Sequence, residues 1–160
     1  MTAPMIARRL RRALALPAIE QGLALEALIY LALCRSMLAL LPFRIAMQRL
    51  GLRLHAGGIV SQSAPGSGSG STPGLGPGSA IGLAVQRASS IAPFKAVCLQ
   101  QALAAALMLR RRGHDVEVYF GLAKDAEGKL IAHAWSKCHG GLVTGGQQMP
   151  HYTQISVFVT

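Results

Sequence analysis

The chain is poor in acidic residues and in aromatic residues. Six Asp and Glu face sixteen Lys and Arg, which gives a net charge of +10, and aromatics make up 5% of the 160 residues. Clustered basic residues bind phosphates, but the aromatic side chains on which bases stack are scarce. We therefore expect no nucleic-acid partner. An acidic membrane surface, partner protein or peptide substrate accounts for the charge equally well.

Cysteine is also scarce. The chain has three, at positions 34, 98 and 138, and this odd number without framework spacing disfavours a disulfide-stapled secreted domain. The apolar run at residues 13–19 is short, contains Pro17 and meets Glu20, so it does not resemble a cleavable signal. These features favour a reducing, cytoplasmic location.

The longest apolar run, residues 23–43, predicts a long helix. Pro17 suits the first turn of that helix and Pro42 ends it. A membrane span over this run would bury Glu26 and Arg35 on opposite sides of the helix, each at a cost of about 2.5–3.5 kcal/mol near the bilayer centre. We expect a packed or peripheral helix, with membrane association as an open alternative.

A stretch rich in Gly, Ser and Pro divides the chain. Residues 57–79 have the composition of a flexible linker and lack the lysine, strand and helix of a phosphate-binding loop. The predicted organisation is an N-terminal helical segment at 1–56, this linker at 57–79, and a folded domain at 80–160.

The domain at 80–160 predicts two helices followed by a small antiparallel sheet. Apolar residues recur at helical spacing in its first part and alternate with polar residues in its second part. The predicted helices are 80–90 and 98–112, and the predicted strands are 116–120, 130–137, 142–144 and 152–159. This order indicates the α+β class.

Cys98 stands where the loop after Pro93 turns into the second helix. A helix N-terminus stabilises a thiolate, and its free N–H groups can hold an oxyanion. His133 follows within the second predicted strand, two residues before Trp135 and on the same face. A lone cysteine or strand histidine is commonly a packing residue. Together they follow the order of thiol nucleophile and base in papain-like enzymes.

No metal site or cofactor site is predicted. Cys138 and His139, taken with Cys98 and His133, do not form the paired short-spacing motifs of zinc ligands, and we place Cys138-His139 in a hairpin turn. We expect Cys34 to pack within the N-terminal apolar helix. The remaining histidines lie near predicted loops or element ends, where we expect them to be solvated: His55, His114 and His151.

Six segments carry a resemblance to a known family: Ala84 to Ala88, Pro93 to Ala104, Leu109 to Gly113, Phe120 to Leu122, Ala132-His133-Ala134-Trp135, and Leu41 to Arg44. They resemble the transglutaminase-like cysteine peptidases of lasso-peptide biosynthesis, the B2 leader-peptidase proteins. The N-terminal half is similar to the arginine-flanked, leucine-rich helices that precede the peptidase in that family.

The resemblance implies a papain/transglutaminase-like core in which Cys98 and His133 cleave the leader from a ribosomally made precursor. It also implies two partners. An asparagine-synthetase-like cyclase would take the freed core peptide, and ATP dependence would reside in that cyclase. A separate leader-recognition protein would deliver the precursor, because no winged recognition domain precedes the peptidase here.

The sequence departs from the family at the third catalytic group. An acid commonly follows the histidine by about a dozen residues, yet no carboxylate occurs after Glu127. Thr144, Gln147, Asp115 or a backbone carbonyl remain as candidates to orient His133, as does a dyad acting alone. Another transglutaminase-like amidase or acyltransferase, and a catalytically inactive peptide-binding scaffold, remain as alternative functions.

Overall fold

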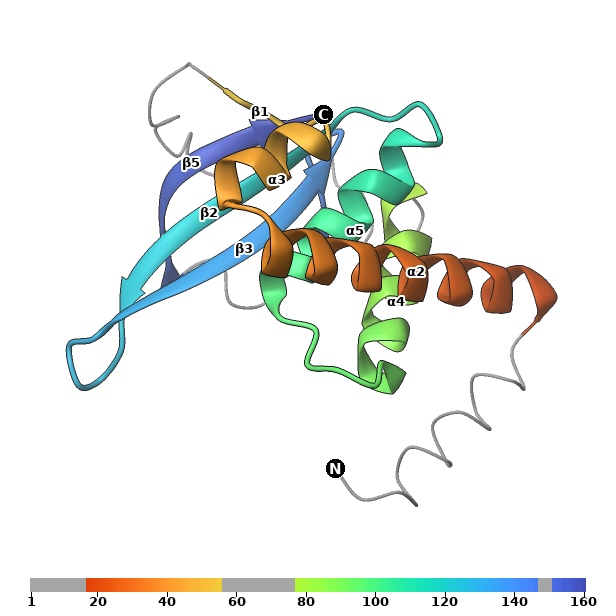
Figure 1. Ribbon diagram of the computed structural model, residues 1–160, viewed down its shortest axis with the longest axis horizontal. Coiled ribbons are helices and arrows are strands. Elements are labelled where there is room, and N and C mark those ends of the chain that lie inside the picture. The colour runs from red at the N-terminus through yellow and green to blue at the C-terminus, as the bar shows by residue number, and fades with distance from the viewer. Residues whose placement is uncertain (1–16, 56–76, 147–150) are drawn as a thin grey trace.

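The computed structural model describes residues 17–55, 77–146 and 151–160. It contains four helices and five strands in this described part, drawn in Figure 1. The helices are α2 (Ala18–Leu40), α3 (Phe43–Arg49), α4 (Pro77–Ile91) and α5 (Cys98–Arg110), and the strands are β1 (Arg53–Leu54), β2 (Val116–Lys124), β3 (Leu130–Cys138), β4 (Gly141–Thr144) and β5 (Thr153–Val159). The predicted α+β class is confirmed.

The strands form one antiparallel sheet in the order β1-β5-β2-β3-β4. Its centre is the β2–β3 hairpin, which pairs continuously from Val116 with Cys138 to Lys124 with Leu130. Strand β1 was not predicted and corrects the wholly helical description of residues 1–56. Two residues are too few to show alternation, and β1 exists through its pairing with β5.

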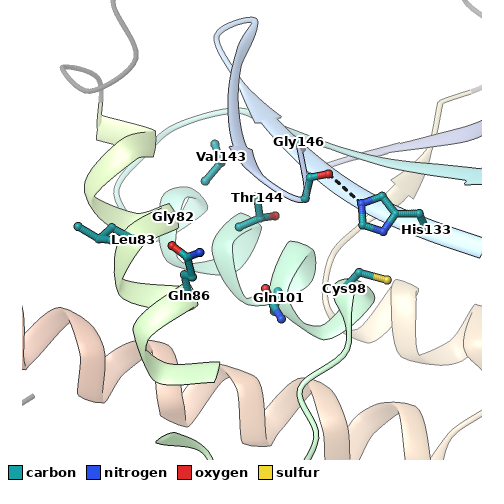
Figure 2. Close-up of a pocket in the computed structure, with 10 residues that line it drawn as sticks. Gly82, Leu83, Gln86, Cys98, Gln101, His133, Val143, Thr144 and Gly146 are labelled. Carbon is teal, nitrogen blue, oxygen red and sulfur yellow. Dashed lines mark hydrogen bonds between the residues drawn. The ribbon is translucent and has the colours of Figure 1, made fainter. Parts of the chain in front are cut away.

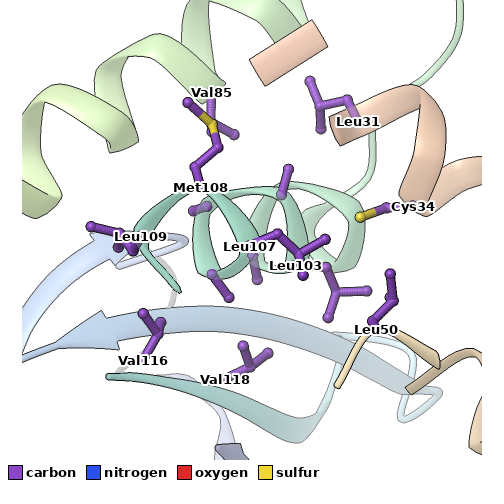
Figure 3. Packing of buried hydrophobic residues seen from close by; sticks show 14 of the residues in the cluster. Leu31, Cys34, Leu50, Val85, Leu103, Leu107, Met108, Leu109, Val116 and Val118 are labelled. Atoms are coloured by element: carbon purple, nitrogen blue, oxygen red, sulfur yellow. The ribbon is translucent and has the colours of Figure 1, made fainter. Parts of the chain in front are cut away.

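Helix α5 lies at the centre of the molecule. Figure 3 shows it between helices α2 and α4 on one side and the sheet on the other. Its Ala- and Leu-rich sequence buries every residue from Ala102 to Leu109, and the small alanines let the neighbouring elements approach closely. The core cluster also includes Leu31, Val85 and Val118, from α2, α4 and β2.

The hydrophobic core joins both sides of the predicted linker. Residues of α2 and α3 belong to the same buried cluster as residues of α4, α5 and the sheet. Helix α4 begins at Pro77, three residues before its predicted start at 80, so the last residues of the predicted linker are helical. The rest of that linker, residues 57–76, lies outside the described residues.

Two polar residues of the long apolar helix α2 contact opposite ends of α5. Glu26 pairs with Arg111 and, through both carboxylate oxygens, with Arg112, where the shortest contact is 2.6 Å. Arg35 lies over the ring of Phe94 at 5.3 Å and donates to the backbone carbonyl of Lys95, just before α5. The two charges that argue against a membrane span therefore both have partners within the fold.

Helix α2 is nonetheless long and apolar enough to cross a membrane by length and composition, and 22% of its most apolar stretch is buried. A core helix of a soluble protein and an N-terminal signal segment have the same properties. Its outer face carries exposed apolar residues: Ile19, Leu25, Ile29, Leu33 and Leu40.

Candidate active site

Cys98 is the first residue of α5, as the sequence predicts. Val97 before it is extended, and its N–H donates to the side chain of Gln100 at 3.1 Å. The Gln101 side chain holds the loop by donating to the carbonyl of Ala96 at 2.9 Å. The first helical bond runs from the Gln101 N–H to the Val97 carbonyl. The N–H groups of residues 98–100 therefore have no acceptor within the helix.

His133 is oriented by a backbone carbonyl. Its Nε2 lies 2.8 Å from the carbonyl oxygen of Gly145, which follows β4. A carbonyl oxygen only accepts hydrogen bonds, so Nε2 carries the proton and Nδ1 of the neutral ring has a free lone pair. The residue is 7% exposed, and its ring contacts those of Tyr152 and Trp135, with centroids 5.0 and 6.1 Å away. These contacts limit its rotation.

Only glycine fits at position 145. The residue has φ of +75°, and a Cβ there would lie 2.7 Å from the carbonyl oxygen of Ala134, 2.9 Å from Cβ of Trp135 and 3.1 Å from Nε2 of His133. Both the left-handed backbone and the lack of a side chain are therefore needed to bring this carbonyl to the histidine.

Cys98 and His133 line one pocket of about 490 Å³, drawn in Figure 2. No hydrogen bond joins them in the described part of the chain, and catalytic hydrogen bonds are often long before substrate binds. Among the residues that the structure describes, no Asp, Glu, Lys or Arg lines the pocket. The other lining residues are Gly82, Leu83, Gln86, Gln101, Val143, Thr144, Gly145 and Gly146.

The other candidates to orient His133 have different positions. The Thr144 hydroxyl forms a buried hydrogen bond of 2.8 Å with Ser136. Asp115 interacts with Cys138, five residues or roughly 17 Å along β3 from His133. Gln147 lies outside the described residues. Of the groups considered, the structure therefore brings a backbone carbonyl to the histidine.

The four residues weighed as metal ligands separate into two places. Cys98 and His133 line the pocket, whereas Cys138 and His139 lie at the β3–β4 turn, which confirms that part of the prediction. Cys138 is buried, and its burial, with a smaller contribution from Asp115, raises the pKa of its thiol.

The other singled-out residues follow the prediction except one. His55 and His151 are exposed, but His114 is half-buried and its ring contacts that of His139. Cys34 packs in the core as expected, and burial raises the pKa of its thiol to about 12.

Sequence reasoning missed the pocket residues from α4 and α5. Gly82, Leu83 and Gln86 come from one side of α4, and Gln101 lies one turn after Cys98. A glutamine on an apolar helix beside the nucleophile is the signal that points to Gln101. Gly82 is needed because a Cβ there would lie 2.3 Å from the carbonyl oxygen of Val143 on β4.

Comparison with known proteins gives a family. The family model described as the transglutaminase-like superfamily matches residues 37–157, more than half of the chain and all of the site. No curated protein and no solved structure matches the chain. The matched range covers α3, both helices that line the pocket, and the sheet except for the last two residues of β5. The chain therefore belongs to the transglutaminase-like superfamily, whose members are generally enzymes of the cysteine-protease type.

Proposed function

We propose that this chain is a cysteine peptidase that removes the leader from a lasso-peptide precursor. The observation that supports a thiol hydrolase most strongly is the shared pocket of Cys98 and His133, in which the proton on Nε2 of His133 leaves Nδ1 free to act as a base. The narrower assignment to lasso-peptide precursors rests on the sequence resemblance.

In the proposed reaction, Cys98 loses its proton to Nδ1 of His133 and its sulfur attacks the carbonyl carbon at the leader–core junction. The oxyanion that forms is stabilised by N–H groups at the start of α5. His133 then gives the proton to the departing core amine as the C–N bond breaks. Water, deprotonated by His133, hydrolyses the leader thioester and restores the thiol.

The pocket suits a short uncharged segment of peptide. Its volume is about 490 Å³, and the described residues that line it are neither acidic nor basic, which favours small or polar residues around the cleaved bond. Gln86 and Gln101 offer amide groups that can bind the peptide backbone. The net charge of +10 favours acidic segments of the precursor outside this pocket.

The proposal includes two protein partners and no cofactor on this chain. An asparagine-synthetase-like cyclase consumes the freed core peptide and supplies any ATP dependence, and a leader-recognition protein delivers the precursor. No nucleic acid takes part. The proposed location is the cytoplasm, with peripheral membrane contact through the exposed apolar face of α2.

The test combines the purified chain with a precursor peptide and the candidate recognition protein, and follows products by mass spectrometry. The expected result is release of leader and core by wild type and none by Cys98→Ala or His133→Ala. Adding hydroxylamine separates hydrolysis from acyl transfer, because an acyltransferase forms the hydroxamate of the leader as its main product.

A peptide-binding scaffold without activity is the second candidate. Two observations favour it. Among the described residues, no hydrogen bond joins Cys98 to His133, and no carboxylate is hydrogen-bonded to His133. A scaffold binds precursor with equal affinity before and after Cys98→Ala and releases no leader in either form, so the same experiment separates the two functions.

A further inference from the structure

A second cluster of reactive side chains lies away from the pocket. His114 belongs to the loop between α5 and β2, Cys138 ends β3, and His139 begins the turn into β4. Each offers one ligand atom, and these atoms all lie within 4.8 Å of one another. The proposed leader cleavage uses none of the three residues.

Two turns bring the cluster together. Val116 pairs with Cys138, which places the loop before β2 beside the turn after β3. His139 has φ of +50°, the left-handed region that non-glycine residues rarely adopt. Gly140 after it has φ of +76° and completes the turn. This backbone places the His139 ring against the His114 ring, with centroids 5.5 Å apart.

The spacing of the two imidazoles matches that of neighbouring ligands on one metal ion. Nε2 of His139 lies 3.4 Å from Nδ1 of His114. In a tetrahedral zinc site with Zn–N bonds of about 2.0–2.1 Å, two ligating nitrogens are about 3.3–3.4 Å apart. A nitrogen and a sulfur ligand are about 3.6 Å apart there. Because the three ligand atoms lie within 4.8 Å of one another, a shift of roughly 1.2 Å brings the Cys138 thiol to that separation.

The charges around the cluster permit a cation. Asp115 is next to His114 and interacts electrostatically with Cys138, so its negative charge favours a cation nearby. A water molecule can complete the coordination as a fourth ligand. The basic residues at the end of α5 have partners elsewhere: Arg110 donates to the carbonyl of Leu50, and Arg111 and Arg112 pair with Glu26. The ammonium of Lys137 lies over the Tyr119 ring.

We propose that His114, Cys138 and His139 bind a zinc ion. A set of two imidazoles and one thiolate binds zinc in preference to magnesium or calcium, which prefer oxygen ligands. On binding, the Cys138 thiol loses its proton to solvent, and sulfur and two nitrogens each donate an electron pair to the metal. The ion connects the loop after α5 to the turn that begins β4. Strand β4 ends beside Gly145, so the ion fixes one end of the strand that orients His133.

The test uses the full chain with Cys98→Ala as background and without a polyhistidine tag, so that neither the pocket thiol nor the tag binds metal. Metal-free protein is titrated with cobalt(II) and with zinc(II). We expect one cobalt per chain, with a thiolate charge-transfer band in the near ultraviolet and visible bands of tetrahedral geometry. Zinc is expected to displace the cobalt and raise the melting temperature.

The variants His139→Asn and Cys138→Ser assign the site. Asparagine tolerates the left-handed backbone and position 139 is exposed, so His139→Asn is expected to fold and to bind at least tenfold more weakly. Cys138→Ser is expected to lose the charge-transfer band. His55→Gln and His151→Gln remove exposed histidines elsewhere and are expected to bind as the background does. Absence of the band, or equal affinity in His139→Asn, would overturn the proposal.

Discussion

The carbonyl oxygen of Gly145 accepts a hydrogen bond from Nε2 of His133 at 2.8 Å. This contact takes the position that a side-chain acid commonly has in the enzymes that the sequence resembles. A carbonyl fixes the tautomer and the direction of the ring, as an acid does. It carries no full negative charge, so it stabilises the imidazolium less. A thiol nucleophile needs less of that stabilisation than a hydroxyl, because it ionises more readily.

Replacing Gly145 tests the orientation of His133. Gly145→Ala combines a disfavoured φ with close contacts to Ala134, Trp135 and His133, so we expect the carbonyl to move and leader cleavage to fall about 100-fold. The measurement is the steady-state rate on a precursor peptide, with stability followed by thermal melting.

Gly128→Ala is the matched control for Gly145→Ala. Gly128 has φ of +79°, close to that of Gly145, but within the described part of the chain no atom lies within 4 Å of its added Cβ. We expect it to lower stability by about 1 kcal/mol and to leave the rate unchanged. Equal rates for the two variants would contradict the role of the Gly145 carbonyl.

The contact between α4 and β4 predicts that replacing glycine by alanine has opposite effects on stability in α4 and in α2. Gly82→Ala places a Cβ 2.3 Å from the carbonyl oxygen of Val143, so the strand and helix must separate, and we expect a loss of about 1–3 kcal/mol. Gly22→Ala on α2 meets no atom of the described residues within 4 Å and should stabilise the helix by about 0.5–1 kcal/mol. Chemical denaturation of the two variants measures both values, and a stabilising Gly82→Ala would contradict the close packing.

The Glu26 ion pair predicts how stability depends on pH. The hydrogen bond from Arg112 holds the pKa of Glu26 below its ordinary value of 4.5, although burial opposes this. A carboxylate whose pKa is lowered by folding stabilises the protein above its unfolded pKa, and the contribution disappears as pH falls through the folded pKa. Glu26→Gln should therefore cost about 1 kcal/mol near pH 7 and progressively less below pH 4.5.

Melting curves of wild type and Glu26→Gln between pH 7 and acid pH measure this difference. Glu127→Gln, which removes an exposed acid of the β2–β3 turn, is the matched control and should change stability little. If the stability difference between wild type and Glu26→Gln stays constant or grows as pH falls, the ion pair does not stabilise the protein as described.

The burial of Cys34 predicts selective alkylation. Burial raises the pKa of its thiol to about 12, and the side chain is fully buried, so it holds little thiolate and reagent cannot reach it. Cys98 is only half-buried and lines the pocket. Brief treatment of the folded protein with iodoacetamide near pH 8 should modify Cys98 before Cys34, as peptide mass mapping shows. Modification of Cys34 first would contradict the packing of α2.

Much of this fold follows from local patterns in the sequence. The sequence predicts the long helix because Pro17 and Pro42 mark its ends, and it predicts the strands of the β2–β3 hairpin because their apolar and polar residues alternate. Strand β1 could not be predicted, because two residues show no periodicity and the strand depends on a distant partner, β5.

The sequence allows the candidate catalytic side chains to be predicted, but not the backbone carbonyl that contacts one of them. Cys98 and His133 stand out by residue type and position. The Gly145 carbonyl does not, because every residue has one, and its approach depends on the β3–β4 register and on a positive φ. The contact of His114 with His139 likewise depends on the left-handed backbone of His139.

In the proposed function, the Cys98 thiol cleaves a peptide bond with His133 as its base. The most direct measurement is mass spectrometry of a precursor peptide incubated with its recognition protein and either wild type or Cys98→Ala. We expect wild type to release leader and core, and Cys98→Ala to bind the precursor but cleave it at least about 1,000-fold more slowly. Release of leader by Cys98→Ala at the wild-type rate would show that Cys98 is not the nucleophile.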